Sequence, residues 1–93
     1  MNVRRSDKCY VYILFSLLDK KFYTGFTHDL KDRLSRHERG EVISTASRRP
    51  LKLIHYEYFI NEDDGKAREI FLKSGFGRQQ LKLALKDTLR LLV

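Results

Sequence analysis

The chain has 93 residues, enough for one small globular domain and too few for several. Lys and Arg outnumber Asp and Glu by 19 to 12, which gives a net charge of +7. This charge favours an anionic partner, and nucleic acid is the first candidate. A basic composition that serves only solubility is an equally good explanation. One cysteine excludes a disulfide framework and a zinc site built from thiolates. With no signal-type or transmembrane run, the sequence predicts a cytoplasmic protein without a membrane partner.

A polar tail and a β-hairpin are expected at the start of the chain. Residues 1–8 are polar and charged, and we interpret them as a flexible tail, which leaves residues 9–93 as the single domain. Residues 9–15 and 22–27 are rich in aromatic, aliphatic and β-branched side chains, which is typical of strands. The intervening residues 17–21 predict the hairpin loop.

A helix is expected directly after the second of these strands. Either Thr27 or Asp29 can cap its N-terminus, and Gly40 stands where a helix stop belongs. Arg33 and His37 are four residues apart within this helix, so their side chains share one face.

A polar loop, a third strand and a second helix are predicted next. Residues 41–50 carry small hydroxyl side chains and two adjacent arginines, which suit contact with phosphate but also fit an ordinary solvated loop. Residues 51–60 have apolar side chains on both faces of an alternating pattern, as expected for a strand covered by helices. A helix over residues 61–74 follows, and Gly75 and Gly77 are expected to end it.

The C-terminal segment, residues 78–93, is predicted to be a third helix. Leucines recur along it at helical spacing, and they are more numerous than one small sheet needs. The helix either caps the core or offers a surface to a protein partner or a second copy of the chain. The whole pattern predicts an α/β (α+β) fold with a small three-stranded, mainly antiparallel sheet flanked by helices in the order ββαβαα.

Two tyrosine-containing tripeptides precede an arginine, a histidine and a later glutamate. The tripeptides are Tyr-Val-Tyr at residues 10–12 and Tyr-Thr-Gly at residues 23–25. Arg33 lies ten residues after the start of the second tripeptide, His37 one helical turn later, and Glu69 in the predicted second helix. This ordered set resembles the GIY-YIG nuclease family, in particular its small stand-alone bacterial members, over most of the chain. The chain departs from the usual pattern with tyrosine for the first glycine and threonine for the second isoleucine.

The resemblance implies a metal-dependent DNA endonuclease that hydrolyses phosphodiester bonds, is structure-specific and acts in DNA repair or recombination. Glu69 would bind Mg²⁺ or Mn²⁺, and one carboxylate is sufficient because Mg²⁺ keeps several positions for water and phosphate. Arg33 would clamp the scissile phosphate with its planar pair of donors. Tyr12 and Tyr23 are the general-base candidates, with a preference for Tyr12, and His37 would accept a proton, orient a tyrosine or bind phosphate.

Several further basic residues are candidates for contact with a DNA backbone. They are Arg36, Arg39, Arg48, Arg49, Lys73 and Arg78. The DNA partner is expected to be branched, flapped or damaged, with weak sequence preference because no base-reading cluster is present. Two other interpretations stay open: a non-catalytic or partner-dependent DNA-binding module of the same fold, and a structural interaction protein that uses residues 78–93.

Overall fold

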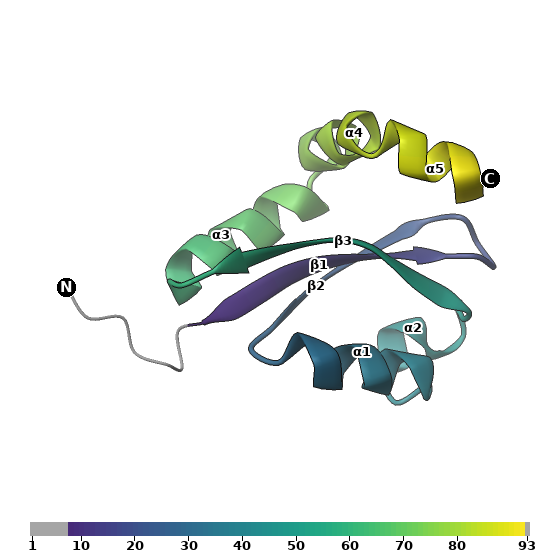
Figure 1. Cartoon of the computed structure of the whole chain (residues 1–93), viewed down its shortest axis with the longest axis horizontal. Helices are drawn as coiled ribbons and strands as arrows, with labels where there is room; N and C mark the ends of the chain where they lie inside the picture. The colour runs from purple at the N-terminus through teal and green to yellow at the C-terminus, as the bar shows by residue number, and fades with distance from the viewer. Residues whose placement is uncertain (1–7, 93) are drawn as a thin grey trace.

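Three antiparallel strands form the sheet that organises the chain. The computed structural model describes residues 8–92, and in it β1 (Cys9–Ser16) lies between β2 (Phe22–Thr27) and β3 (Leu51–Phe59). Both neighbours pair with β1 in antiparallel register. The predicted α+β fold with a three-stranded antiparallel sheet is confirmed (Figure 1).

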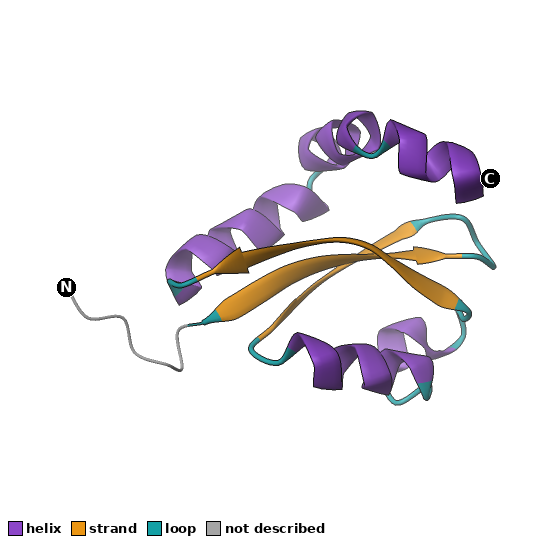
Figure 2. Cartoon of the chain, viewed as in Figure 1, coloured by secondary structure: helices purple, strands orange, loops and turns teal. Residues whose placement is uncertain are grey.

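Helices cover both faces of this sheet in two separate groups. The first group is α1 (Leu30–Glu38) and α2 (Ile43–Ala46), which lie below the strands in Figure 1. The second group lies above the strands and consists of α3 (Glu62–Lys73), α4 (Gly75–Ala84) and α5 (Lys86–Leu92). Figure 2 shows the same separation, with the orange strands between the two sets of purple helices.

The side chains of β1 alternate between these two faces, as the two-residue period of a strand requires. Val11 and Ile13 pack with Leu72 of α3 and Leu81 of α4 in the apolar core. Tyr12, between them in sequence, meets α1 instead, where its hydroxyl contacts a helical side chain. One strand therefore supplies both the centre of the core and the start of a polar site.

Capping residues fix where α1 begins and ends. Asp29 is the N-cap, and its carboxylate accepts a hydrogen bond from the backbone N–H of Asp32 at 3.0 Å. Thr27, the other candidate, accepts one from the backbone N–H of Asp29 at 3.0 Å and so supports the turn before the helix. Gly40 follows the helix with φ of +76°, a conformation that favours glycine.

The segment expected to be a polar loop contains the short helix α2. Its N-cap, Val42, makes no side-chain capping hydrogen bond, so the sequence carried no start signal there. Thr45 within it is completely buried. The interpretation of this segment as an ordinary solvated loop is therefore wrong for its central residue.

The C-terminal segment differs from the single helix predicted over residues 78–93. Ser74 ends α3 and also caps α4, because its hydroxyl oxygen accepts the Gly77 N–H at 3.1 Å. The glycines expected to stop a helix thus lie in the first turn of the next one. A Cβ at Gly77 would lie 2.8 Å from Leu72 Cα, so glycine permits the close packing of α3 and α4. A second break at Leu85 separates α4 from α5.

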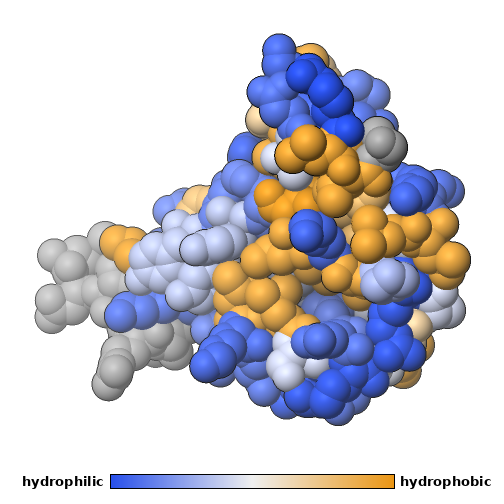
Figure 3. All heavy atoms as spheres, turned by 45° about the vertical axis from the view of Figure 1, so that its right-hand side comes forward, coloured by the Kyte–Doolittle hydropathy of each residue, from blue (hydrophilic) through white to orange (hydrophobic). Residues whose placement is uncertain are grey.

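The C-terminal helices leave apolar side chains uncovered. Figure 3 shows hydrophobic surface beside them, and Leu83 and Leu91 are 74% and 86% exposed. Among the helices of residues 8–92, none has the length and apolar character needed to cross a membrane.

Candidate active site

A buried hydrogen bond joins the sheet to α1. The Tyr12 hydroxyl lies 2.7 Å from His37 Nε2, and the two side chains come from β1 and α1. Tyr12 is completely buried, and His37 is only 2% exposed. The phenol and the imidazole therefore interact in a site from which water is largely excluded.

The other nitrogen of His37 is also engaged. Nδ1 lies 2.7 Å from the hydroxyl oxygen of Thr45 in α2, and that oxygen is 3.4 Å from the Val42 carbonyl oxygen. Burial lowers the pKa of His37, and the positive charge of Arg33 lowers it further. The imidazole is accordingly neutral near pH 7, with one nitrogen toward the tyrosine and the other toward the threonine.

Tyr23 of β2 completes an aromatic triangle around His37. Its ring centroid is 5.2 Å from that of His37 and 6.3 Å from that of Tyr12. The Ser44 hydroxyl lies 3.5 Å from the Tyr23 hydroxyl. Unlike Tyr12, Tyr23 keeps part of its side chain exposed, which leaves its hydroxyl accessible to a substrate or water.

Gly25 makes room for the Tyr12 ring. The two residues are directly opposite each other in the β1–β2 register. A Cβ at Gly25 would lie 2.7 Å from Tyr12 Cε1 and closer still to Cζ and the hydroxyl oxygen. No side chain larger than hydrogen fits without displacing the phenol, which gives the glycine of the second tripeptide a steric role.

Arg33 and Glu69 act on the Tyr12 hydroxyl from two helices. Burial is the main cause that raises the pKa of Tyr12, Arg33 opposes this rise, and Glu69 adds to it. Arg33 lies one turn before His37 on α1, and Glu69 lies on α3, where its side chain is 20% exposed. Four of the five residues predicted to be catalytic, Tyr12, Tyr23, Arg33 and His37, thus lie around one phenol, and Glu69 acts on it only through charge.

A known family matches most of the chain. The GIY-YIG catalytic domain matches residues 8–82, most of the chain. The chain belongs to the GIY-YIG family.

Bacterial proteins of similar length are similar to the chain in sequence. A UPF0213 protein of Streptococcus pyogenes is 40% identical over 80 residues, 85% of each chain. A UPF0213 protein from the region 5′ of ldhD in Pediococcus acidilactici is 37% identical over 76 residues, 78% of this chain and 76% of its own. A third, from Clostridium perfringens, is 34% identical over 82 residues, 87% of each chain. No solved structure matches the chain.

Glu69 is the carboxylate predicted to bind a metal ion. The described residues contain no group of three or more His, Cys, Asp or Glu side chains that could hold a metal. Glu69 offers hard oxygen ligands, which fit Mg²⁺ or Mn²⁺ and not a thiolate-bound metal. Its Oε2 atom lies 2.9 Å from the ammonium of Lys73, so a bound cation would compete with that lysine.

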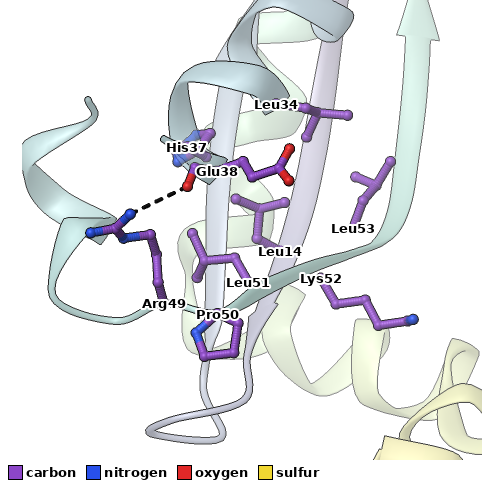
Figure 4. A pocket seen from close by; sticks show the side chains of 9 residues that line it. All are labelled: Leu14, Leu34, His37, Glu38, Arg49, Pro50, Leu51, Lys52 and Leu53. Carbon is purple, nitrogen blue, oxygen red and sulfur yellow. Dashed lines mark hydrogen bonds between the residues drawn. The ribbon is translucent and has the colours of Figure 1, made fainter. Parts of the chain in front are cut away.

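Two of the predicted DNA-contacting arginines are bound within the protein. Arg48 pairs with Asp19 at 2.6 Å and holds the hairpin loop. Arg49 donates to the carbonyl oxygens of Ala46 at 2.9 Å and Glu38 at 3.3 Å. Figure 4 shows the latter bond at the edge of the groove that His37 lines. Both guanidinium groups already stabilise the segment between α1 and β3.

The other predicted contact residues lie at the surface. Arg36 pairs with Asp32 at 2.9 Å and Arg39 with Glu41 at 2.6 Å, and all four side chains are about half exposed. Exposed pairs of this kind contribute only about 0–1 kcal/mol, so phosphate can replace the carboxylate. Arg78 donates to a backbone carbonyl at the end of α3.

Sequence reasoning missed Thr45 as a partner of His37. It treated this residue as part of a phosphate-binding or solvated loop, eight positions away from the histidine in sequence. A hydroxyl residue in a segment without helix signals gives no indication of the element it packs against. The i,i+4 spacing of Arg33 and His37 was informative, because both residues belong to one helix.

Proposed function

We propose that this protein is a divalent-metal-dependent DNA endonuclease that hydrolyses phosphodiester bonds of branched, flapped or damaged DNA in repair or recombination. The observation that carries the proposal is the buried Tyr12–His37 hydrogen bond with Arg33 beside it. Nucleases need a base for the attacking water and positive charge for the phosphate oxygens. These residues supply both from rigid elements.

The geometry favours Tyr12 as the group that takes a proton from water. Burial keeps the phenol protonated in the resting enzyme, since it raises the pKa of Tyr12. The phenol can accept a proton only as it releases its own, and His37 Nε2 at 2.7 Å is positioned to receive that proton. Both nitrogens of His37 are occupied by protein groups, so this residue fits proton acceptance and orientation better than phosphate binding.

The remaining steps of hydrolysis follow from charge. The water oxygen forms a bond to phosphorus, the bond to the leaving oxygen breaks, and the leaving alkoxide takes a proton from solvent. Arg33 stabilises the negative charge on the equatorial oxygens and on Tyr12. A divalent ion on Glu69 would neutralise phosphate charge. Tyr23, partly exposed next to Tyr12, orients water or phosphate.

The positive charge supports DNA as the substrate. A location in the bacterial cytoplasm, where DNA is present, is consistent with a DNA substrate. The net charge of +7 favours the phosphate backbone, which carries no sequence information. The exposed leucines of α4 and α5 remain the proposed surface for a protein partner or a second copy of the chain.

Cleavage assays with matched acidic variants test the proposal. Single-stranded, nicked, flapped and branched DNA would be incubated with the protein and Mg²⁺, Mn²⁺ or EDTA. We expect metal-dependent nicking of at least one branched or flapped substrate, and we expect Glu69→Ala to abolish it. Asp64→Ala removes an exposed carboxylate from the same helix and should leave cleavage unchanged.

Three results would overturn or redirect the proposal. Equal activity of the wild type and Glu69→Ala would indicate a contaminating nuclease or a wrong metal ligand. DNA binding without cleavage on every substrate would support a non-catalytic binding module. Tyr12→Phe should reduce cleavage more than Tyr23→Phe, and the reverse order would exchange the roles of the two tyrosines.

A further inference from the structure

We propose that Thr45 is a positioning residue that fixes His37 in the neutral tautomer with the proton on Nδ1 and the lone pair on Nε2. As a statement about catalysis it rests on the proposed function, but the tautomer can be measured without any substrate. The observations that carry it are two hydrogen bonds of 2.7 Å on opposite sides of one buried imidazole.

Counting protons around the Tyr12 hydroxyl determines the orientation of the hydrogen bonds. The hydroxyl has one proton to donate, and its recorded hydrogen-bond partner among residues 8–92 is His37 Nε2. Arg33, which also hydrogen-bonds to this hydroxyl, can only donate, whereas Tyr23 and Glu69 affect the pKa of Tyr12 through charge alone. If Nε2 carried a proton, the tyrosine oxygen would receive two donors and its own proton would lack an acceptor. The tyrosine must therefore donate to Nε2, which requires the lone pair to be there.

Thr45 provides the matching partner on the other nitrogen. A neutral imidazole with an unprotonated Nε2 carries its proton on Nδ1, and the Thr45 oxygen at 2.7 Å accepts it. The Thr45 proton is then directed to the Val42 carbonyl oxygen, 3.4 Å away in the same helical turn. In the series Tyr12, His37, Thr45 and Val42, each hydrogen bond between neighbouring groups then pairs one donor with one acceptor.

The packing holds this arrangement in place. Thr45 is 0% exposed, so bulk water does not compete with its hydroxyl for His37 Nδ1. A β-branched side chain has restricted rotamers, which keeps the Thr45 hydroxyl directed at the ring. The short helix α2, which carries no evident substrate-binding group of its own at this position, gains a specific function: it delivers a hydrogen-bond acceptor to the back of His37.

The tautomer matters for proton transfer from Tyr12. When Tyr12 takes a proton from water, its original proton moves to His37 Nε2, and the resulting imidazolium keeps its Nδ1 proton on Thr45. No atom other than hydrogen changes partners in this relay. The imidazolium later returns the proton to Tyr12 as the phenol releases the proton taken from water to solvent, which restores the resting state. The opposite tautomer has no lone pair toward the tyrosine and cannot accept the proton.

Nitrogen-15 NMR of the His37 side chain, in the full-length protein without DNA, tests the assignment directly. The wild type should show a protonated Nδ1 and an unprotonated Nε2. Thr45→Ser keeps the hydroxyl and should keep this signature. Thr45→Val keeps the shape but removes the acceptor, and its signature should shift toward protonated Nε2. Ser47→Ala, at the exposed C-cap of α2, serves as the control and should match the wild type.

Cleavage kinetics then test the role in catalysis. Thr45→Val should lower kcat at least about tenfold while the affinity for uncleaved DNA changes little, and Thr45→Ser should restore most of kcat. A protonated Nε2 in the wild type, or an unchanged signature in Thr45→Val, would overturn the proposal. If Thr45→Val does not fold by circular dichroism, the wild-type spectrum alone decides. A shifted tautomer in a protein without nuclease activity would preserve the role of Thr45 and remove the proposed function.

Discussion

The two faces of the sheet bury different kinds of side chain from the same strand. On the face covered by α3 and α4, β1 places Val11 and Ile13 against an apolar cluster. On the face covered by α1 and α2, it places Tyr12 against His37 through a hydrogen bond and an edge-on ring contact, and Leu14 lines a groove there with His37 and Leu34. No buried side-chain nitrogen or oxygen of the described residues lacks a hydrogen-bond partner.

These two kinds of burial differ in what they contribute. A fully buried aliphatic side chain contributes about 1.5–3 kcal/mol to folding, whereas a hydrogen bond contributes about 0.5–1.5 kcal/mol net. The apolar face should therefore carry most of the stability, and the polar face should carry the chemistry. A substitution on one face that has the effect expected for the other face would contradict this division of stability and chemistry.

The largest expected change is in stability, on the apolar face. Leu72 is completely buried between the sheet and α4, so Leu72→Ala leaves a cavity as well as losing burial. We expect the free energy of unfolding to fall by about 2–5 kcal/mol in urea denaturation. Leu83→Ala, at a position 74% exposed on α4, should change it by no more than about 0.5 kcal/mol. Similar losses for both would mean that the core is not where we place it.

The next change is in turnover, on the polar face. Arg33→Ala should cost about 3–4 kcal/mol in transition-state stabilisation, or a hundredfold or more in rate. Its affinity for DNA should change much less, because one phosphate contact among several is lost. Single-turnover cleavage and direct binding separate the two effects. Lys31→Ala removes an exposed charge from the same helix and serves as the control. An equal loss of cleavage rate in both variants would mean that Arg33 acts only as a surface charge and not as a group that stabilises the transition state.

Gly25→Ala should affect both properties, because Gly25 faces the Tyr12 ring across the strand pair. The added methyl group must displace the phenol, which should cost about 1–3 kcal/mol of stability and also reduce cleavage. Gly75 is the matched control, since a Cβ there meets nothing within 4 Å. Gly75→Ala should leave cleavage unchanged and stabilise the protein by up to about 1 kcal/mol. Normal cleavage by Gly25→Ala would show that the Tyr12 ring is not held as described.

Short-range residue patterns were enough to predict individual strands and helices. The aromatic and β-branched composition of β1, and the four-residue spacing in α1, predicted the strand, the helix and the shared face of Arg33 and His37. The chain's resemblance to GIY-YIG nucleases added Tyr12, Tyr23 and Glu69 to the same site. In the structure Tyr12, Tyr23 and His37 contact one another, and Arg33 hydrogen-bonds to Tyr12, whereas Glu69 affects the Tyr12 pKa only through charge; the roles of all five stay predictions.

Contacts between distant segments could not be predicted in this way. Thr45 reaches His37 through a four-residue helix without a capping side chain, and Arg48 turns back to Asp19 in the hairpin loop. Ser74 was also ambiguous, because a serine before two glycines fits a helix end as well as a new N-cap. Only the close packing of α3 on α4 decides between them.

The smallest expected change concerns DNA affinity and its dependence on salt. If about six phosphates are neutralised, the logarithm of the binding constant should fall against the logarithm of salt concentration with a slope near −5. Arg36 is exposed on α1, near the proposed site, and its pair with Asp32 is weak enough to be exchanged for a phosphate. Arg36→Gln should lower affinity only about two- to fivefold and make the slope shallower by about one.

Arg90 provides the matched control for this last measurement. It carries the same charge, pairs with Asp87 on α5, and lies in the helix group on the opposite face of the sheet from α1. If DNA binds along the α1 face, Arg90→Gln should leave the slope unchanged although it lowers the net charge equally. Equal changes for both variants would mean that DNA responds to the overall charge of +7 and not to the polar face. A difference between them would place the bound backbone on the side of the sheet where Tyr12 meets His37.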